Sequence, residues 1–94
     1  MEFGIDRRAE PRLEVDIRAR VKSLDPVTSI GPSTVGRVVE ISRHGLKLRV
    51  RRPFMIGASL QILAERKMFL AKVRHCSPVE DDYHVGVLLS ELDS

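Results

Sequence analysis

Two short segments of the chain carry more polar groups than a simple connection between strands requires. The first holds Arg7, Arg8 and Arg12, and the second is the stretch EISRHG at residues 40–45. Arginine presents a planar fork of donors that suits phosphate oxygens and the edge of a guanine. A plain hairpin needs only an Asn-Gly or Asp-Gly pair. The two segments are therefore candidates for ligand contacts, although a purely structural turn would also explain Ser42 and Gly45.

The groups that could support catalysis or metal binding lack the partners that such chemistry needs. Ser42 and His44 are separated by one residue across a turn, and no carboxylate is placed to orient the imidazole. His75 and Cys76 are adjacent, so on a strand they point to opposite faces and lack the spacing of a zinc site. Neither a Gly-x-Gly-x-x-Gly loop nor a Walker loop is present. We expect a non-enzymatic domain without catalytic residues, metal or cofactor, in which Cys76 is partly buried and His75 lies at the surface or at an interface.

Composition places the chain among single, small globular domains. Its 94 residues can build one core but not two. It has no apolar run long enough to cross a bilayer, and charged residues interrupt the first twenty positions, where a secretory signal would lie. A lone Cys76 is typical of a reducing compartment. We therefore expect a cytoplasmic protein without membrane insertion, and the net charge of +3 is too small to indicate nucleic-acid binding by itself.

Alternation of apolar and polar residues predicts an all-β fold. From Leu13 to Lys22 every second residue is apolar or Ala and the intervening ones are charged, which is typical of a half-buried strand. Further strands are expected at about residues 35–42, 46–51, 59–65, 67–76 and 82–92. Short turns and the absence of helical spacing favour a small, closed or nearly closed antiparallel barrel of six strands, because closure removes exposed sheet edges. Residues 13–94 would form this barrel, and residues 1–12 a flexible arginine-rich segment before it.

The faces of the strands follow from the same alternation. In the second strand, Val39 and Ile41 are expected to point inward, and Val38, Glu40 and Ser42 outward. After Gly45 the pattern resumes, with Arg49 and Arg51 expected on the solvated face.

The two polar segments, in this order and spacing, resemble the signature of the PilZ domain, the bacterial receptor module for cyclic di-GMP. That family carries RxxxR before its first strand and (D/N)xSxxG at the end of its second. Here the first is "RAEPR" and the second is "EISRHG", with Glu40 in place of Asp or Asn. The resemblance covers nearly the whole chain, because "LEVDIRARV", "RPFMIGASLQI" and "YHVGVLL" are similar to the family's first strand, its connection into the fourth and its closing strand.

The resemblance implies a six-stranded barrel of the split PilZ type, a ligand, cyclic di-GMP, and a set of residues that bind it. Arg8 and Arg12 would fork onto guanine O6 and N7 or onto phosphate oxygens, as arginine does in DNA recognition. Arg7 would add a phosphate contact or stack on a purine. The implied binding set is Arg7, Arg8, Arg12, Glu40, Ser42 and Gly45.

The second motif would form one rim of the guanine site. Glu40 and Ser42 share a strand face, so the carboxylate would accept from guanine N1–H and N2–H₂ while the hydroxyl bonds N2 or a phosphate oxygen. Gly45 would allow a positive φ in the turn and leave room for the ligand. Ser42 and Gly45 could equally be explained as turn residues alone. Glu40 could pair with Arg37 or Arg12.

Three functions remain open from the sequence. The first is a cyclic di-GMP receptor that passes the binding event to a downstream protein effector. The second is a PilZ-like domain that has lost nucleotide binding and serves as a protein-interaction module, which the longer side chain of Glu40 keeps under consideration. The third, a small barrel for single-stranded nucleic acid, is disfavoured because aromatic residues make up 4% of the chain and are scattered.

Overall fold

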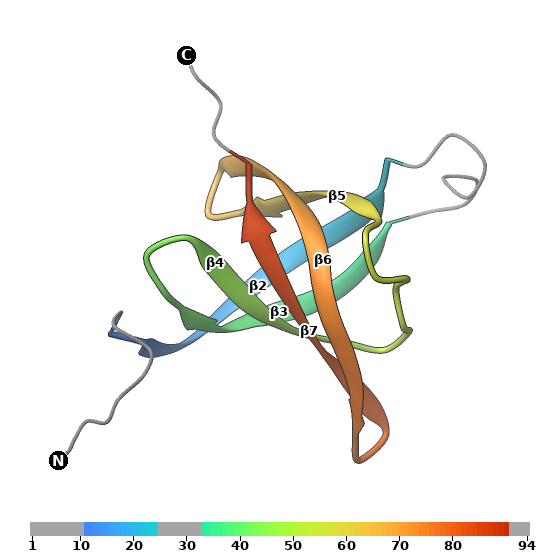
Figure 1. Cartoon of the computed structure of the whole chain (residues 1–94). Helices are drawn as coiled ribbons and strands as arrows, with labels where there is room; N and C mark the ends of the chain where they lie inside the picture. The colour runs from blue at the N-terminus through green and yellow to red at the C-terminus, as the bar shows by residue number, and fades with distance from the viewer. Residues whose placement is uncertain (1–10, 25–32, 91–94) are drawn as a thin grey trace, which may run out of the picture.

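The computed structural model describes residues 11–24 and 33–90. These residues form six antiparallel strands (Figure 1). These ranges contain no helix, and hence none capable of crossing a membrane. In chain order the strands are β2 (Leu13–Ser23), β3 (Thr34–Ile41), β4 (Gly45–Val50), β5 (Ser59–Ala64), β6 (Lys67–Val79) and β7 (Asp82–Leu89).

The strands close into a barrel in the order β2-β3-β4-β7-β6-β5, with β5 pairing back onto β2. This confirms the six-stranded antiparallel barrel that the sequence predicts. The expected strand ends lie within one residue of the observed ones except in β6, which continues to Val79 rather than ending at Cys76, and in β7, which ends at Leu89 rather than reaching residue 92. Pro78 is tolerated there because β5 pairs with β6 only as far as Lys72, so a missing N–H on that side breaks no ladder. The β6–β7 hairpin extends beyond the barrel body (Figure 1).

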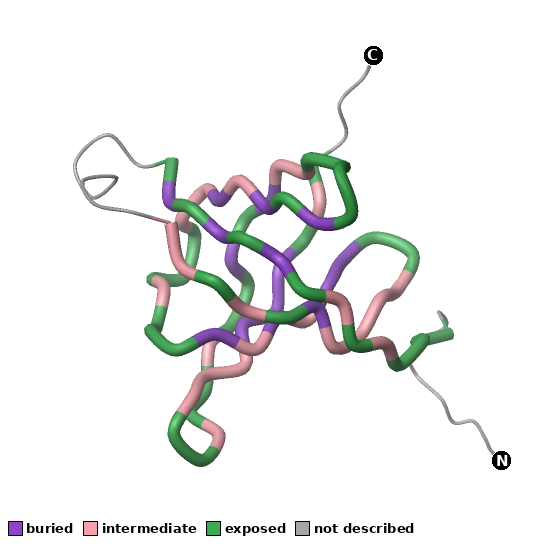
Figure 2. Tube along the Cα trace, turned by 180° about the vertical axis from the view of Figure 1, so that it is seen from behind, coloured by how far each residue is buried: buried purple, intermediate pink, exposed green. Residues whose placement is uncertain are grey.

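Aliphatic side chains from all six strands form the core of the barrel. Figure 2 marks the buried positions along the chain in purple. Val21, Leu48 and Leu60 are among the fully buried residues. Because apolar and polar residues alternate, each strand turns its apolar face to this core and leaves its charged side chains on the outside of the barrel. The outer face is therefore where a ligand or partner can meet charged groups.

A bulge at Val39 corrects the expected facing of β3. Val38 pairs with Leu48 of β4 and Glu40 pairs with Lys47, so Val39 has no partner in β4. A bulge inserts one extra residue and shifts the alternation by one position. Val38 is consequently buried in the core, where the sequence predicted it outside, and Val39 is not part of that core. Beyond the bulge Ile41 packs inward as expected, which leaves Glu40 on the outer face.

Candidate ligand-binding site

An ion pair joins the segment before β2 to the end of β3. The Arg12 guanidinium donates to the Glu40 carboxylate, with Nη1 and Oε1 2.8 Å apart. The two strands make this contact possible because Leu13, next to Arg12, pairs with Ile41, next to Glu40. Of the two possible partners for Glu40 that the sequence offered, Arg12 is therefore the observed one, and Arg37 pairs instead with Asp16 at 2.7 Å.

The turn between β3 and β4 is held by its own hydrogen bonds. The Ser42 backbone N–H donates to the Gly45 carbonyl at 3.0 Å, and the Ser42 hydroxyl lies 3.3 Å from the same oxygen. A third bond ties the turn to β7, since the Leu89 N–H donates to the His44 carbonyl at 2.8 Å. The structural role that Ser42 could have as a turn residue is thus present, and it leaves the hydroxyl oxygen's lone pairs available to a donor.

Gly45 is required for a different reason from the one the sequence suggested. The expected positive φ is absent, because among the described glycines only Gly57 adopts one. A Cβ on Gly45 would instead fall well inside van der Waals distance of the Val87 carbonyl oxygen, the result of close pairing between β4 and β7. The absence of a side chain at Gly45 therefore allows the start of β4 to approach β7 this closely.

A cavity of about 390 Å³ opens beside these residues. Arg12, Glu40, Ser42 and Gly45 all line it, so the described members of the expected binding set share one cavity. Its size falls in the range of small-molecule sites, about 300–1,000 Å³. Arg7 and Arg8 lie outside the described residues, and their position relative to the cavity is therefore not part of this geometry.

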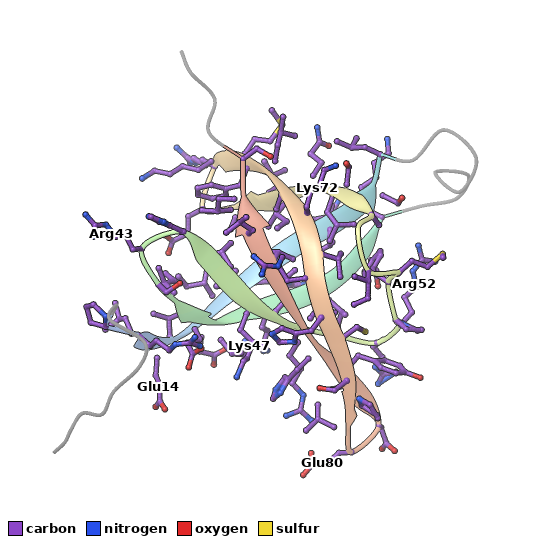
Figure 3. The ribbon with its side chains drawn as sticks, viewed as in Figure 1. Glu14, Arg43, Lys47, Arg52, Lys72 and Glu80 are labelled. Carbon is purple, nitrogen blue, oxygen red and sulfur yellow. The ribbon has the colours of Figure 1, made fainter. Side chains whose placement is uncertain are left out.

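The cavity is positively charged overall. Among the described residues, Arg12, Lys47 and Arg74 line it together with a single carboxylate, Glu40. Lys47 stands opposite Glu40 in the β3–β4 register, and its Nζ is 3.9 Å from Glu40 Oε1. Glu14 pairs with Glu40, and Glu40 pairs with Lys47, so the three residues lie in one row across β2, β3 and β4. Figure 3 shows Lys47 and Glu14 projecting from the same side of the barrel. Three cations against one anion favour a ligand that carries negative charge.

His75 from β6 completes one wall. A Cβ on Gly86 would meet the imidazole of His75, so the absent side chain of Gly86 provides the space that the ring occupies. A bulge between Val73 and His75 aims the histidine across β7, and His75 lines the cavity beside Gly86. His75 is exposed and Cys76 partly buried, as the sequence predicts.

Sequence reasoning missed several cavity residues because they become neighbours only through strand register. The additional polar residues lining the cavity are His44, Lys47, Arg74 and His75. For Lys47 a usable signal existed, since it lies on the outward face of the strand that follows EISRHG. Arg43, at the tip of the turn in Figure 3, is exposed and does not line the cavity.

Next to the cavity, the outer face of β4 and β7 carries a second group of charges. Arg49 Nε lies 2.8 Å from Asp82 Oδ2, and its Nη2 lies 2.8 Å from Glu80 Oε1. Hydrogen bonds to Glu80 and Asp82 raise the pKa of the Arg49 guanidinium. Burial lowers the pKa of His84, and the positive charges of Lys47 and Arg49 lower it further. Arg49 is thus engaged in ion pairs rather than simply solvated.

No cluster of three or more potential metal ligands occurs within residues 11–24 and 33–90.

Comparison with protein families assigns the chain. The PilZ domain model matches residues 6–94, nearly the full length, and the chain therefore belongs to the PilZ domain family. PilZ domains are a family of cyclic di-GMP-binding modules, and the closed six-stranded barrel agrees with this membership. A search of curated proteins found no match.

Proposed function

We propose that this PilZ domain is a non-enzymatic, cytoplasmic bacterial receptor that binds cyclic di-GMP in the cavity lined by Arg12, Glu40, Ser42 and Gly45. The observation that carries the proposal is the meeting of the two sequence motifs at one cavity: Arg12 from the RxxxR segment contacts Glu40 of the ExSxxG segment at 2.8 Å.

The chemistry of the cavity suits the parts of this ligand. Its cations, Arg12, Lys47 and Arg74, complement two phosphates, and arginine in particular can fork onto phosphate or onto guanine O6 and N7. The Glu40 carboxylate accepts from guanine N1–H and N2–H₂, which no other common base presents in that arrangement. The half-buried Ser42 hydroxyl donates to the Gly45 carbonyl, and its oxygen accepts a further hydrogen bond from an N–H of the base.

The neighbouring arginines Arg7 and Arg8 enter the proposal through the RxxxR motif. They would add cationic contacts to the phosphates or guanines of the ligand, and the domain would pass the binding event to a downstream protein effector.

A specific observation also supports the alternative of a PilZ domain without nucleotide binding. In the structure Glu40 is already satisfied by Arg12 and approached by Lys47, so a guanine must compete for a carboxylate that has partners. If Glu40 stays paired with Arg12 and Lys47 in the presence of cyclic di-GMP, the guanine does not bind. The domain then acts as a protein-interaction module.

Calorimetric titration with cyclic di-GMP distinguishes the two. For a receptor we expect micromolar or tighter affinity, about −8 kcal/mol or better, which Arg12→Ala abolishes and Ser42→Ala weakens less. Arg66→Ala, in the β5–β6 turn outside the cavity, is the matched control and should bind as the unchanged protein does. Absence of binding by folded protein, or unaltered affinity in Arg12→Ala, would contradict the assignment.

A further inference from the structure

Three arginines stand in register across three neighbouring strands on the outer face of the barrel. Arg18 on β2 pairs with Arg37 on β3, and Arg37 pairs with Arg49 on β4. Side chains directly opposite one another in antiparallel strands are close neighbours, and like charges there are destabilising. The barrel therefore maintains a row of mutually repelling guanidinium groups that its core does not require.

A cleft of about 520 Å³ follows this row, and it is larger than the cavity at Glu40. Besides the three arginines of the row, its lining among the described residues includes Arg51 and a single carboxylate, Asp82. A smaller hollow of about 180 Å³ shares Arg18 with the cleft and adds Arg20. We call these two neighbouring depressions, which share Arg18 and Val35, the arginine cleft.

Acidic partners compensate only one end of the arginine cleft. At the β7 end, Asp82 pairs with Arg49 at 2.8 Å and approaches Arg51 at 3.6 Å. At the β2 end, Arg18 and Arg20 have no ion pair with any residue in the described ranges.

Arg37 in the middle of the row is compensated weakly. It pairs with Asp16, but both side chains are more than half exposed, 56% and 71%, so this pair contributes little. The uncompensated positive charge is therefore concentrated where Arg18, Arg20 and Arg37 meet.

An apolar contact lies in the same place. Val35 pairs with Arg20, lines both depressions and is 45% exposed. An aliphatic side chain of a ligand could pack on this exposed valine, while anionic groups on either side of it bind the flanking arginines.

We propose that the arginine cleft docks an acidic segment of a partner protein. One carboxylate bridges Arg18 and Arg37, which relieves the repulsion between them, and a second contacts Arg20, with an aliphatic side chain packed on Val35. A peptide fits better than a nucleic acid because none of the described residues that line the cleft is aromatic and able to stack on bases. This inference does not rest on cyclic di-GMP binding, although Lys47 and Arg49 place the two sites two residues apart on β4.

The test uses a short fluorescein-labelled peptide in which glutamate and valine alternate, titrated with the whole chain and followed by fluorescence anisotropy. The double variant Arg18→Glu/Arg37→Glu should weaken binding about tenfold or more, because two charge-assisted contacts become repulsive. The matched control is Arg43→Glu/Lys72→Glu, which changes the net charge equally at two exposed positions, the β3–β4 turn and β6, that line neither depression. It should retain nearly full affinity. Arg18→Ala, which introduces no new charge, should give an intermediate loss.

Mapping the bound peptide by amide chemical shifts gives an independent readout. The proposal expects the largest changes at Val35, Gly36 and Val50, which line the cleft. It is overturned if the peptide fails to bind, if both double variants lose affinity equally, or if the shifts fall at Glu40 and Lys47. The proposal is also overturned if inorganic pyrophosphate displaces the peptide and the affinity of the peptide does not change when its valines are replaced. These two results together would assign the cleft to phosphate.

Discussion

The Arg12 guanidinium and the Glu40 carboxylate are in direct contact at 2.8 Å although 28 residues separate them in the chain. The register of β2 against β3 brings them together, and the side chain of Glu40 is 20% exposed while that of Arg12 is 43% exposed. A ligand that uses either group must therefore share or displace the other. The affinity of the cavity for such a ligand therefore depends on the strength of the ion pair between Arg12 and Glu40.

Shortening Glu40 should release Arg12. In Glu40→Asp the carboxylate is withdrawn by one methylene, which weakens the contact with Arg12. A partly exposed ion pair is worth at most about 1 kcal/mol, so we expect cyclic di-GMP affinity to rise about twofold to fivefold. Calorimetry measures the change. Glu14→Asp is the control, because Glu14 stands opposite Glu40 in the register but does not line the cavity. A loss of affinity in Glu40→Asp would show that the ligand needs the longer reach of glutamate.

Gly45 and Gly57 should both resist substitution, for separable reasons. In Gly45→Ala the new Cβ collides with the Val87 carbonyl, which should destabilise the fold by about 1–3 kcal/mol and distort the cavity wall. In Gly57→Ala the space is open, but a φ of +89° disfavours alanine by about 1–2 kcal/mol. Urea unfolding should show both losses, whereas only Gly45→Ala should also weaken ligand binding. Equal ligand affinity in the two variants would argue against a role of Gly45 at the cavity.

Strand alternation explains why most of the barrel was predictable. The period-two pattern in β2 fixes which side chains face the core, and Ala19 and Val21 are buried as expected. Alternation fails where one extra residue is inserted. The bulge at Val39 has no signature in a run of two valines, because either residue can fill the core, and the pairing with β4 decides between them.

The cavity was predictable only in the part that lies within motifs. Arg12, Glu40, Ser42 and Gly45 belong to the two motifs on which the resemblance to the PilZ family rests. Lys47 and His75 reach the cavity through register across β3, β4, β7 and β6, and no local pattern specifies that register. The same limit applies to Gly45, whose close approach to Val87 depends on a strand more than forty residues later in the chain.

Asp82 should stabilise the β6–β7 hairpin more than Glu80 does. Asp82 contacts both Arg49 and Arg51, and its side chain is 23% exposed, whereas Glu80 contacts Arg49 alone and is 77% exposed. Solvent screens the more exposed pair more strongly. We therefore expect Asp82→Asn to lower Tm clearly and Glu80→Gln to change it little, as measured by thermal unfolding followed by circular dichroism. High salt should narrow the difference, and an equal effect of both substitutions would contradict this assignment.

His84 should titrate below its ordinary pKa of 6.5. Burial is the main cause, and the charges of Lys47 and Arg49 lower the pKa further, while Glu40 opposes them. Between the folded pKa and 6.5 the unfolded chain binds a proton that the folded chain does not. Stability therefore falls as the pH drops through this window and levels off below the folded pKa.

Imidazole chemical shifts followed against pH measure the pKa of His84 directly. Lys47→Met should raise it, because one neighbouring positive charge is removed. Lys72→Met, an exposed lysine on β6 that does not shift His84, should leave it unchanged. His84→Gln should remove this contribution to the pH dependence of unfolding. Binding of an anionic ligand beside Lys47 should raise the pKa of His84 as well, since it offsets the same positive charge. A pKa at or above 6.5 in the free protein would contradict the burial and charge that this face of the barrel provides.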